Sequence, residues 1–126
     1  MRYFVEPDPA WDLSELDGET LSVELSWMPD ALAGRLEELV ATPPLVQALL
    51  AADVSGFSTG PARGYFTENS LDDSAVAPEL RRLVVGDDPA ADLAYVPDVG
   101  LVASERAVAV LRAHCSSITI EPLPAS

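Results

Sequence analysis

The chain has 126 residues, of which 48% are hydrophobic and only 6% aromatic. This length and composition predict one domain, residues 1–126, with a core of mainly aliphatic side chains. The net charge is -14, from 21 acids against seven bases that are all arginine. Such a balance argues against nucleic acid or an anionic membrane as a partner, because both would be repelled.

The sequence also bears on the compartment. We find no signal peptide and no apolar run of about 18 residues, so we expect a soluble cytoplasmic protein. The single cysteine, Cys115, excludes an internal disulfide and fits a reducing environment. The acids are spread through both halves of the chain. They form an acidic surface that either serves solubility alone or steers a basic protein partner.

The first quarter of the chain predicts two strands separated by a loop. Residues 2–6 are a strand bounded by prolines. Residues 8–19 are acidic and contain Gly18, so we expect a loop there. Residues 21–27 alternate apolar and polar side chains, which is typical of a strand with one solvated face.

Helical spacing follows in residues 29–40. Pro29 and Asp30 suit the first turn of a helix, and apolar residues recur at i, i+4, i+7 and i+8 from Leu32. The sequence Thr-Pro-Pro at 42–44 ends this predicted helix. A second, shorter helix is expected to run from residue 45 to residue 52.

The middle of the chain is rich in glycine and acids. Residues 54–68 predict two short strand-like pieces around a Gly-Pro turn. An acidic loop follows at 69–78. Residues 80–85 are a strand candidate, with a helix as the rival interpretation. The remaining pieces are an acidic turn at 86–92 and an apolar run at 93–96.

The last third combines pattern, propensity and capping. Residues 99–102 predict a buried strand, and Ser104 stands where a helix N-cap belongs. Glu105 suits the N-terminal end of the helix dipole, whereas Arg112 and His114 suit the C-terminal end. Residues 117–121 then alternate as a half-buried strand.

These elements predict an α+β fold: a single domain with a mixed or mostly antiparallel sheet and two or three helices packed on one side. The expected core is aliphatic and draws on most of the elements. Its predicted members are Val23, Leu25, Leu32, Leu36, Leu39, Leu49, Val84, Val102, Val108, Leu111, Ile118 and Ile120.

Catalytic and metal-binding patterns are weak. His114 beside Cys115 would have to serve any nucleophilic scheme, but a histidine at a helix end is also a good partner for the dipole. Four acids in the acidic turn and beyond lack the spacing of a calcium loop: Asp87, Asp88, Asp92 and Asp98. We therefore predict no catalytic residues, no metal and no cofactor.

The best candidate for a functional loop is the glycine-rich stretch 56–64. It lacks the Gly-Lys-Ser/Thr ending of a phosphate-binding loop, but aromatic and arginine side chains, which anchor interfaces, gather near it. Paired acids are added as contacts for a basic partner. The predicted partner-binding residues are Phe57, Arg63, Tyr65, Phe66, Asp72, Asp73, Asp87 and Asp88.

One family resemblance lies in the C-terminal part of the chain. Residues 100–112, GLVASERAVAVLR, with Glu121-Pro122-Leu123 after them and residues 83–88 before them, cover about the last 45 residues. This segment resembles the closing segment of an immunity-protein family from bacterial polymorphic toxin systems. The resemblance implies a small cytoplasmic α+β protein that binds and neutralises a cognate toxin, which in many such systems is a basic nuclease.

The functional hypothesis is therefore a non-enzymatic protein-binding module, an immunity or inhibitor protein with a basic partner. One alternative is a small enzyme, or a small-molecule-binding protein that uses residues 56–64. The other is a structural or oligomerisation protein that pairs through exposed strand edges.

Overall fold

The computed structural model describes residues 2–9, 11–35, 38–66 and 78–123, apart from 26–28. Ten strands and two helices lie in this part of the chain. They are β1 (Arg2–Glu6), β2 (Trp11–Asp17), β3 (Thr20–Leu25), β4 (Leu32–Arg35), β5 (Glu38–Ala41), α1 (Pro43–Ala51), β6 (Phe57–Phe66), β7 (Arg81–Val85), β8 (Leu93–Val96), β9 (Gly100–Ser104), α2 (Glu105–His114) and β10 (Thr119–Pro122).

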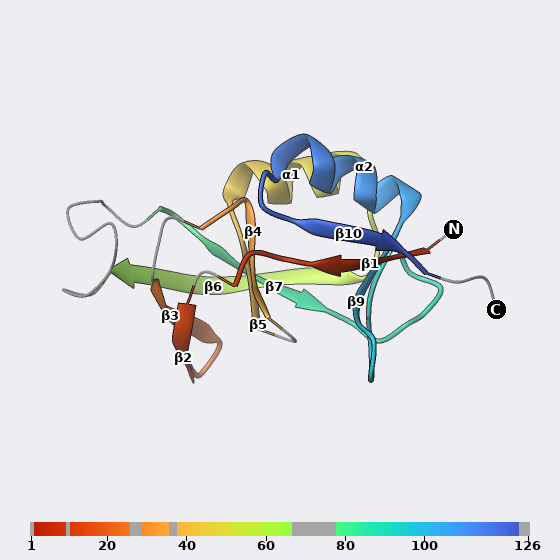
Figure 1. Cartoon of the computed structure of the whole chain (residues 1–126). Coiled ribbons are helices and arrows are strands. Elements are labelled where there is room, and N and C mark those ends of the chain that lie inside the picture. The colour runs from red at the N-terminus through yellow and green to blue at the C-terminus, as the bar shows by residue number, and fades with distance from the viewer. Residues whose placement is uncertain (1, 10, 26–28, 36–37, 67–77, 124–126) are drawn as a thin grey trace.

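The predicted α+β class is confirmed, but the strands form two sheets rather than one. The first has the order β10-β1-β9-β8 and is antiparallel throughout. The first strand of the chain lies at its centre, where Val5 pairs with Leu101 on one side and with Ile120 on the other. Residues near the two ends of the chain consequently lie side by side, and the Leu123 N–H donates to the Arg2 carbonyl at 2.9 Å (Figure 1).

The second sheet has the order β2-β3-β6-β7-β5-β4. Its pairings are antiparallel except for the parallel pair β3–β6. This sheet curls, because β3 at one end packs against β4 and β5 at the other. A side-chain hydrogen bond from Ser14 of β2 to Glu38 of β5 also joins the two ends.

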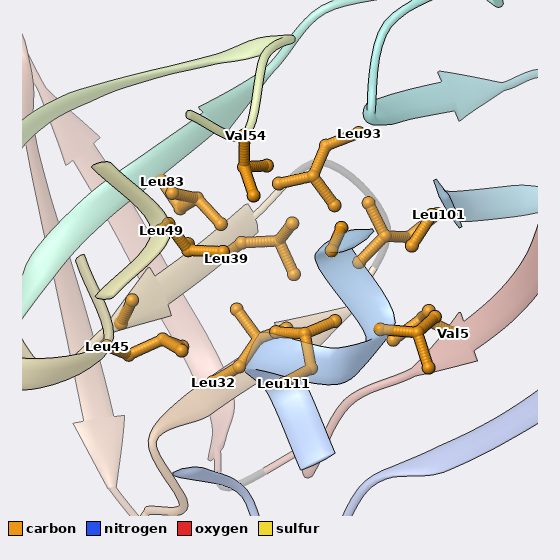
Figure 2. Packing of buried hydrophobic residues seen from close by; sticks show 14 of the residues in the cluster. Val5, Leu32, Leu39, Leu45, Leu49, Val54, Leu83, Leu93, Leu101 and Leu111 are labelled. Atoms are coloured by element: carbon orange, nitrogen blue, oxygen red, sulfur yellow. The ribbon is translucent and has the colours of Figure 1, made fainter. Parts of the chain in front are cut away.

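Two apolar clusters fill the molecule. The main core joins both sheets to both helices, and its leucine and valine side chains converge around α2 (Figure 2). The second core lies inside the curled sheet and consists of Leu21, Val23, Leu25, Ala33, Val40 and Leu80. Neighbouring residues of β5 serve different clusters, since Leu39 faces the main core and Val40 the second.

The two helices lie together on one side of the molecule, and α2 packs against β1 and β9 (Figure 1). Pro43 begins α1, where its missing N–H costs nothing. Ser104 caps α2 as predicted, because its hydroxyl accepts a hydrogen bond from the Ala107 N–H at 3.2 Å. In the part of the chain described, neither helix has the length and apolar character needed to cross a membrane.

The helix predicted for residues 29–40 is wrong. The chain forms the antiparallel hairpin β4–β5 there, with Leu32 paired to Ala41 and Leu39 opposite Gly34. Both faces of this hairpin are buried, one against each core, so its apolar residues do not alternate. A short apolar run of this kind resembles a buried helix in sequence, and periodicity alone does not separate the two.

Two further predictions are corrected. Residues 8–19 are not a loop, since they contain β2, which forms a hairpin with β3. Residues 54–68 do not form two pieces around a Gly-Pro turn, because Gly60 and Pro61 lie inside the single ten-residue strand β6. Pro61 pairs with Arg81 of β7. Residues 57–61 pair with β7 and residues 62–66 pair with β3, and this continuous pairing outweighs the local turn preference of Gly-Pro.

Most of the predicted core is confirmed. Ile118 and Ile120 are partly buried and pack against the main core. Val84 is wrong, because 37% of its surface is exposed. Leu36 lies outside the described residues. The other predicted core residues are buried: Val23, Leu25, Leu32, Leu39, Leu49, Val102, Val108 and Leu111.

Candidate functional site

The predicted aromatic and arginine cluster lies on β6, but the strand separates its members. Phe57 packs against the main core at one end, and Phe66 packs against the second core at the other. Nine residue steps of about 3.3 Å place their backbones about 30 Å apart. The expected functional loop at 56–64 is therefore a strand, and its two phenylalanines serve different cores.

Arg63 and Tyr65 remain together on the outer face of β6. Both are exposed, Tyr65 by 41%. In the parallel pairing with β3, Arg63 lies opposite Ser22 and Tyr65 opposite Glu24. This face carries both signs of charge beside an aromatic ring, so it lacks the single sign that would select a strongly charged partner.

The structure explains why position 56 is a glycine. Its φ is +97°, and a Cβ built at this position would lie 2.0 Å from the carbonyl oxygen of Leu93. Its own carbonyl accepts a hydrogen bond from Gly86 at 2.9 Å. The glycine allows close approach of backbone to β8, rather than of backbone to a phosphate group.

The acidic turn at 86–92 is stabilised by hydrogen bonds between its own residues. Asp87 and Asp88 are exposed, and the Asp88 carboxylate accepts the Ala90 N–H at 2.9 Å while its carbonyl accepts the Ala91 N–H at 3.1 Å. An aspartate that bonds to the backbone two residues later stabilises a turn locally. The other predicted acidic pair, Asp72 and Asp73, lies outside the described residues.

Asp92 is a structural carboxylate. The Ser104 hydroxyl donates to it at 2.6 Å, and the Ser55 N–H and hydroxyl donate at 2.9 and 3.1 Å. These hydrogen bonds, that of Ser104 first, lower the pKa of Asp92 despite a smaller opposing effect of burial. Since Ser104 also caps α2, Asp92 joins the helix N-terminus to the segment before β6.

Asp30 plays a similar part at the other end of α2. Its carboxylate accepts the backbone N–H groups of Ser117 at 2.7 Å, Ser116 at 2.9 Å and Ala31 at 2.8 Å. Partial burial raises the pKa of Asp30, but these donors together outweigh it and the net shift is downward. Asp30 therefore ties the start of β4 to the turn that leads into β10.

His114 and Cys115 are neighbours in sequence that lie in different surroundings. His114 is exposed in the last turn of α2, where it suits the dipole. Burial, and then the nearby charge of Asp30, raise the pKa of the Cys115 thiol to about 11. Within the described ranges no three His, Cys, Asp or Glu side chains are grouped to hold a metal ion.

An exposed acidic hairpin stands out instead. The segment from β2 to β3, residues 11–25, contains five acids and no base. Glu15, Asp17 and Glu19 are exposed at its tip, and Glu38 is brought beside it by the hydrogen bond from Ser14. This acidic hairpin, defined as residues 11–25 with Glu38, has no base of its own among residues 11–25.

Sequence reasoning missed this hairpin although a signal was present. Asp17-Gly18 separates two runs that contain apolar residues, and Asp-Gly is a strong short-range hairpin signature. Gly18 has φ +62° at the first position of the two-residue turn, as a type II′ turn requires. The density of acids around Gly18 is equally typical of a loop, so the local sequence does not separate the two.

The comparisons with known proteins identify no relative: no family model, curated protein or solved structure matches this chain.

Proposed function

We propose that this chain is a non-enzymatic protein-binding module, an immunity or inhibitor protein that neutralises a basic toxin in the cytoplasm. The observation that carries the proposal is the acidic hairpin, in which Glu15, Asp17 and Glu19 are exposed without a neighbouring base in the same hairpin. The likeness of the last 45 residues or so to immunity proteins supports the more specific role.

The physical basis is electrostatic steering. Exposed carboxylates on the hairpin of a chain of net charge -14 attract a basic surface and repel an acidic one, although Glu15 lies in one row of the sheet with Ser22 and Arg63. Charges on an exposed hairpin act over roughly 8 Å at physiological salt and roughly 3 Å at 1 M salt. Binding that depends on them must therefore weaken as salt rises.

The arrangement of the reactive groups favours binding over catalysis. A nucleophilic cysteine needs a lowered pKa, whereas the thiol of Cys115 has a raised one. His114 is exposed at the end of α2, where a charged imidazole suits the helix dipole. Asp30 and Asp92 are both committed to backbone and serine donors that hold the fold together.

The test is capture of a partner from lysate of the source cell at low salt, with identification by mass spectrometry and a wash at about 1 M salt. We expect one basic protein that the salt wash releases. The double variant Glu15→Lys and Asp17→Lys should lose it. The matched variant Glu79→Lys and Glu121→Lys should retain it, since each pair replaces two acids with two bases and changes the net charge from -14 to -10.

Two outcomes would contradict the proposal. If no basic protein is captured, the acidic surface has no partner and serves solubility. If both double variants retain the partner equally, the acidic hairpin does not steer binding.

A further inference from the structure

The edges of the two sheets are treated differently by the fold. Along β8, the Leu93 and Tyr95 N–H groups donate to carbonyls of Ser55 and Gly86 at 2.9 and 2.8 Å, so this edge is covered. A covered edge of this kind is closed to an added strand.

The edges at β4 and β10 are also protected. The Gly34 N–H of β4 donates to the Asp8 carbonyl at 2.7 Å, and Asp8 forms a parallel bridge with Ala33. The edge strand β10 has four residues and ends at Pro122, which lacks an N–H. Short edges and prolines are common protections against strand addition.

The remaining edge is β2, where residues 14–17 form a regular register with β3. In a two-residue hairpin the closing pair, here Asp17 and Thr20, is hydrogen-bonded, and the following pairs alternate. The N–H and C=O groups of Leu16 and Ser14 therefore point away from β3. In the part of the chain that the structure describes, no backbone partner meets them, and the hydrogen bond from Ser14 to Glu38 of β5 is made by the Ser14 hydroxyl, so it leaves the backbone groups available.

We infer that the outer edge of β2 at residues 14–17 accepts an extended, basic segment of the partner as an additional strand. This inference rests on the proposed function, because it gives the place and the manner in which the basic partner binds. Backbone hydrogen bonds to Ser14 and Leu16 would supply affinity, and alternating basic side chains would meet Glu15 and Asp17.

Charge argues against a second copy of this chain as the occupant. Pairing two β2 edges would bring the exposed Glu15 and Asp17 of one copy beside those of the other. Like charges in neighbouring strands destabilise their pairing. The same residues favour a strand with lysine or arginine at alternate positions.

The experiment uses the full chain and a synthetic peptide of nine residues with alternating lysine and valine. Titration followed by NMR gives the dissociation constant, and amide exchange shows which N–H groups become protected. We expect protection of the Ser14 and Leu16 amides. A peptide with glutamate in place of lysine should not bind, which would identify the charge requirement.

The decisive variant is Leu16→Pro, which removes an outward N–H, with Leu16→Ala as its matched control because the Leu16 side chain is 53% exposed. We expect Leu16→Pro to weaken peptide binding about tenfold, and Leu16→Ala to change it less than about twofold. If Leu16→Pro does not fold, a peptide methylated at alternate backbone nitrogens tests the complementary hydrogen bonds, from peptide N–H groups to the Ser14 and Leu16 carbonyls, on the unaltered protein, and its binding should also be weakened.

Equal binding of the methylated peptide, or protection confined to other strands, would overturn the inference. The partner captured from lysate separates this inference from the proposed function. If Leu16→Pro is folded and still binds that partner as tightly as the unaltered chain, the edge inference fails and the proposed function stands. If no basic partner exists, the proposed function fails.

Discussion

Asp30 gives a direct test of how a surface carboxylate can hold together segments distant in the sequence. It accepts N–H groups from Ser116 and Ser117, which lie 86 and 87 residues further along the chain, and from Ala31. Replacing Asp30 with alanine leaves these donors to water. The free energy of unfolding should therefore fall.

The size of this effect follows from the number and exposure of the bonds. A hydrogen bond to a charged acceptor contributes about 1.5–3 kcal/mol when buried. Ser116 and Ser117 are exposed, so water replaces most of each lost bond and the contributions do not add fully. We expect Asp30→Ala to lower the free energy of unfolding by about 2 kcal/mol near pH 7.

The contribution of Asp30 to stability should depend on pH. Since the pKa of Asp30 is lower in the folded protein than its ordinary value of 3.8, its contribution is fully present above that value. The contribution disappears as pH falls through the folded pKa. Urea unfolding should therefore show a gap between the original chain and Asp30→Ala that is full near pH 7 and narrower at about pH 3.

The control is Asp87→Ala, which removes an exposed carboxylate of the acidic turn and should change stability by less than about 0.5 kcal/mol. A gap for Asp30→Ala that stays constant between the two pH values would refute the reasoning, because the loss would then not involve the charged form of the carboxylate.

Three further predictions concern the core, the backbone and the thiol. Leu111→Ala should lower the free energy of unfolding by about 3–5 kcal/mol, because Leu111 is 1% exposed in the main core. Leu50→Ala, at a site 55% exposed, should lower it by less than about 1 kcal/mol. Equal losses in chemical unfolding would contradict the assigned core. Gly56→Ala should lower the melting temperature far more than Gly18→Ala, because a Cβ at Gly56 would strike the backbone while one at Gly18 meets no atom within 4 Å; similar melting temperatures would show that the contact relaxes. The pKa of the Cys115 thiol is raised to about 11, so the thiol should react with a disulfide reagent near pH 8 at least tenfold more slowly in the folded protein than in denaturant. Rapid reaction of the folded protein would instead show an exposed thiolate.

The candidate site was only partly accessible from the sequence. The exposure of Arg63, Tyr65, Asp87 and Asp88 agrees with their selection as surface residues. The prediction that Phe57 joins them in one binding feature is not supported, because β6 is a continuous strand and Phe57 packs against the main core. The acidity was evident from composition, but the concentration of acids on a hairpin at a sheet edge depends on strand pairing.

The hairpin β4–β5 shows why periodicity was insufficient. In a strand with one solvated face, apolar and polar side chains alternate, as they do in β3. That alternation shows which residues face the core. The β4–β5 hairpin is covered on both faces, by the main core on one and by the second core, which includes β3, on the other. Its apolar residues therefore do not alternate with polar ones. Several of the residues that bury it, such as Leu83, Leu101 and Leu111, are remote in the sequence, and local residues do not specify them.

The sequence by itself determined the elements whose signals are local: the alternating strand β3, the Ser104-capped helix α2, and helix α1 from residue 45 onward, whereas the prolines that begin α1 were assigned to the end of a preceding helix. Backbone capping and side-chain alternation act over a few residues, so they can be recognised without the fold. The tertiary structure alone decided the separation into two sheets, the curl of the second, and the exposure of the β2 edge. Those features depend on contacts between distant segments, where burial on a second face and pairing between strands outweigh local preference.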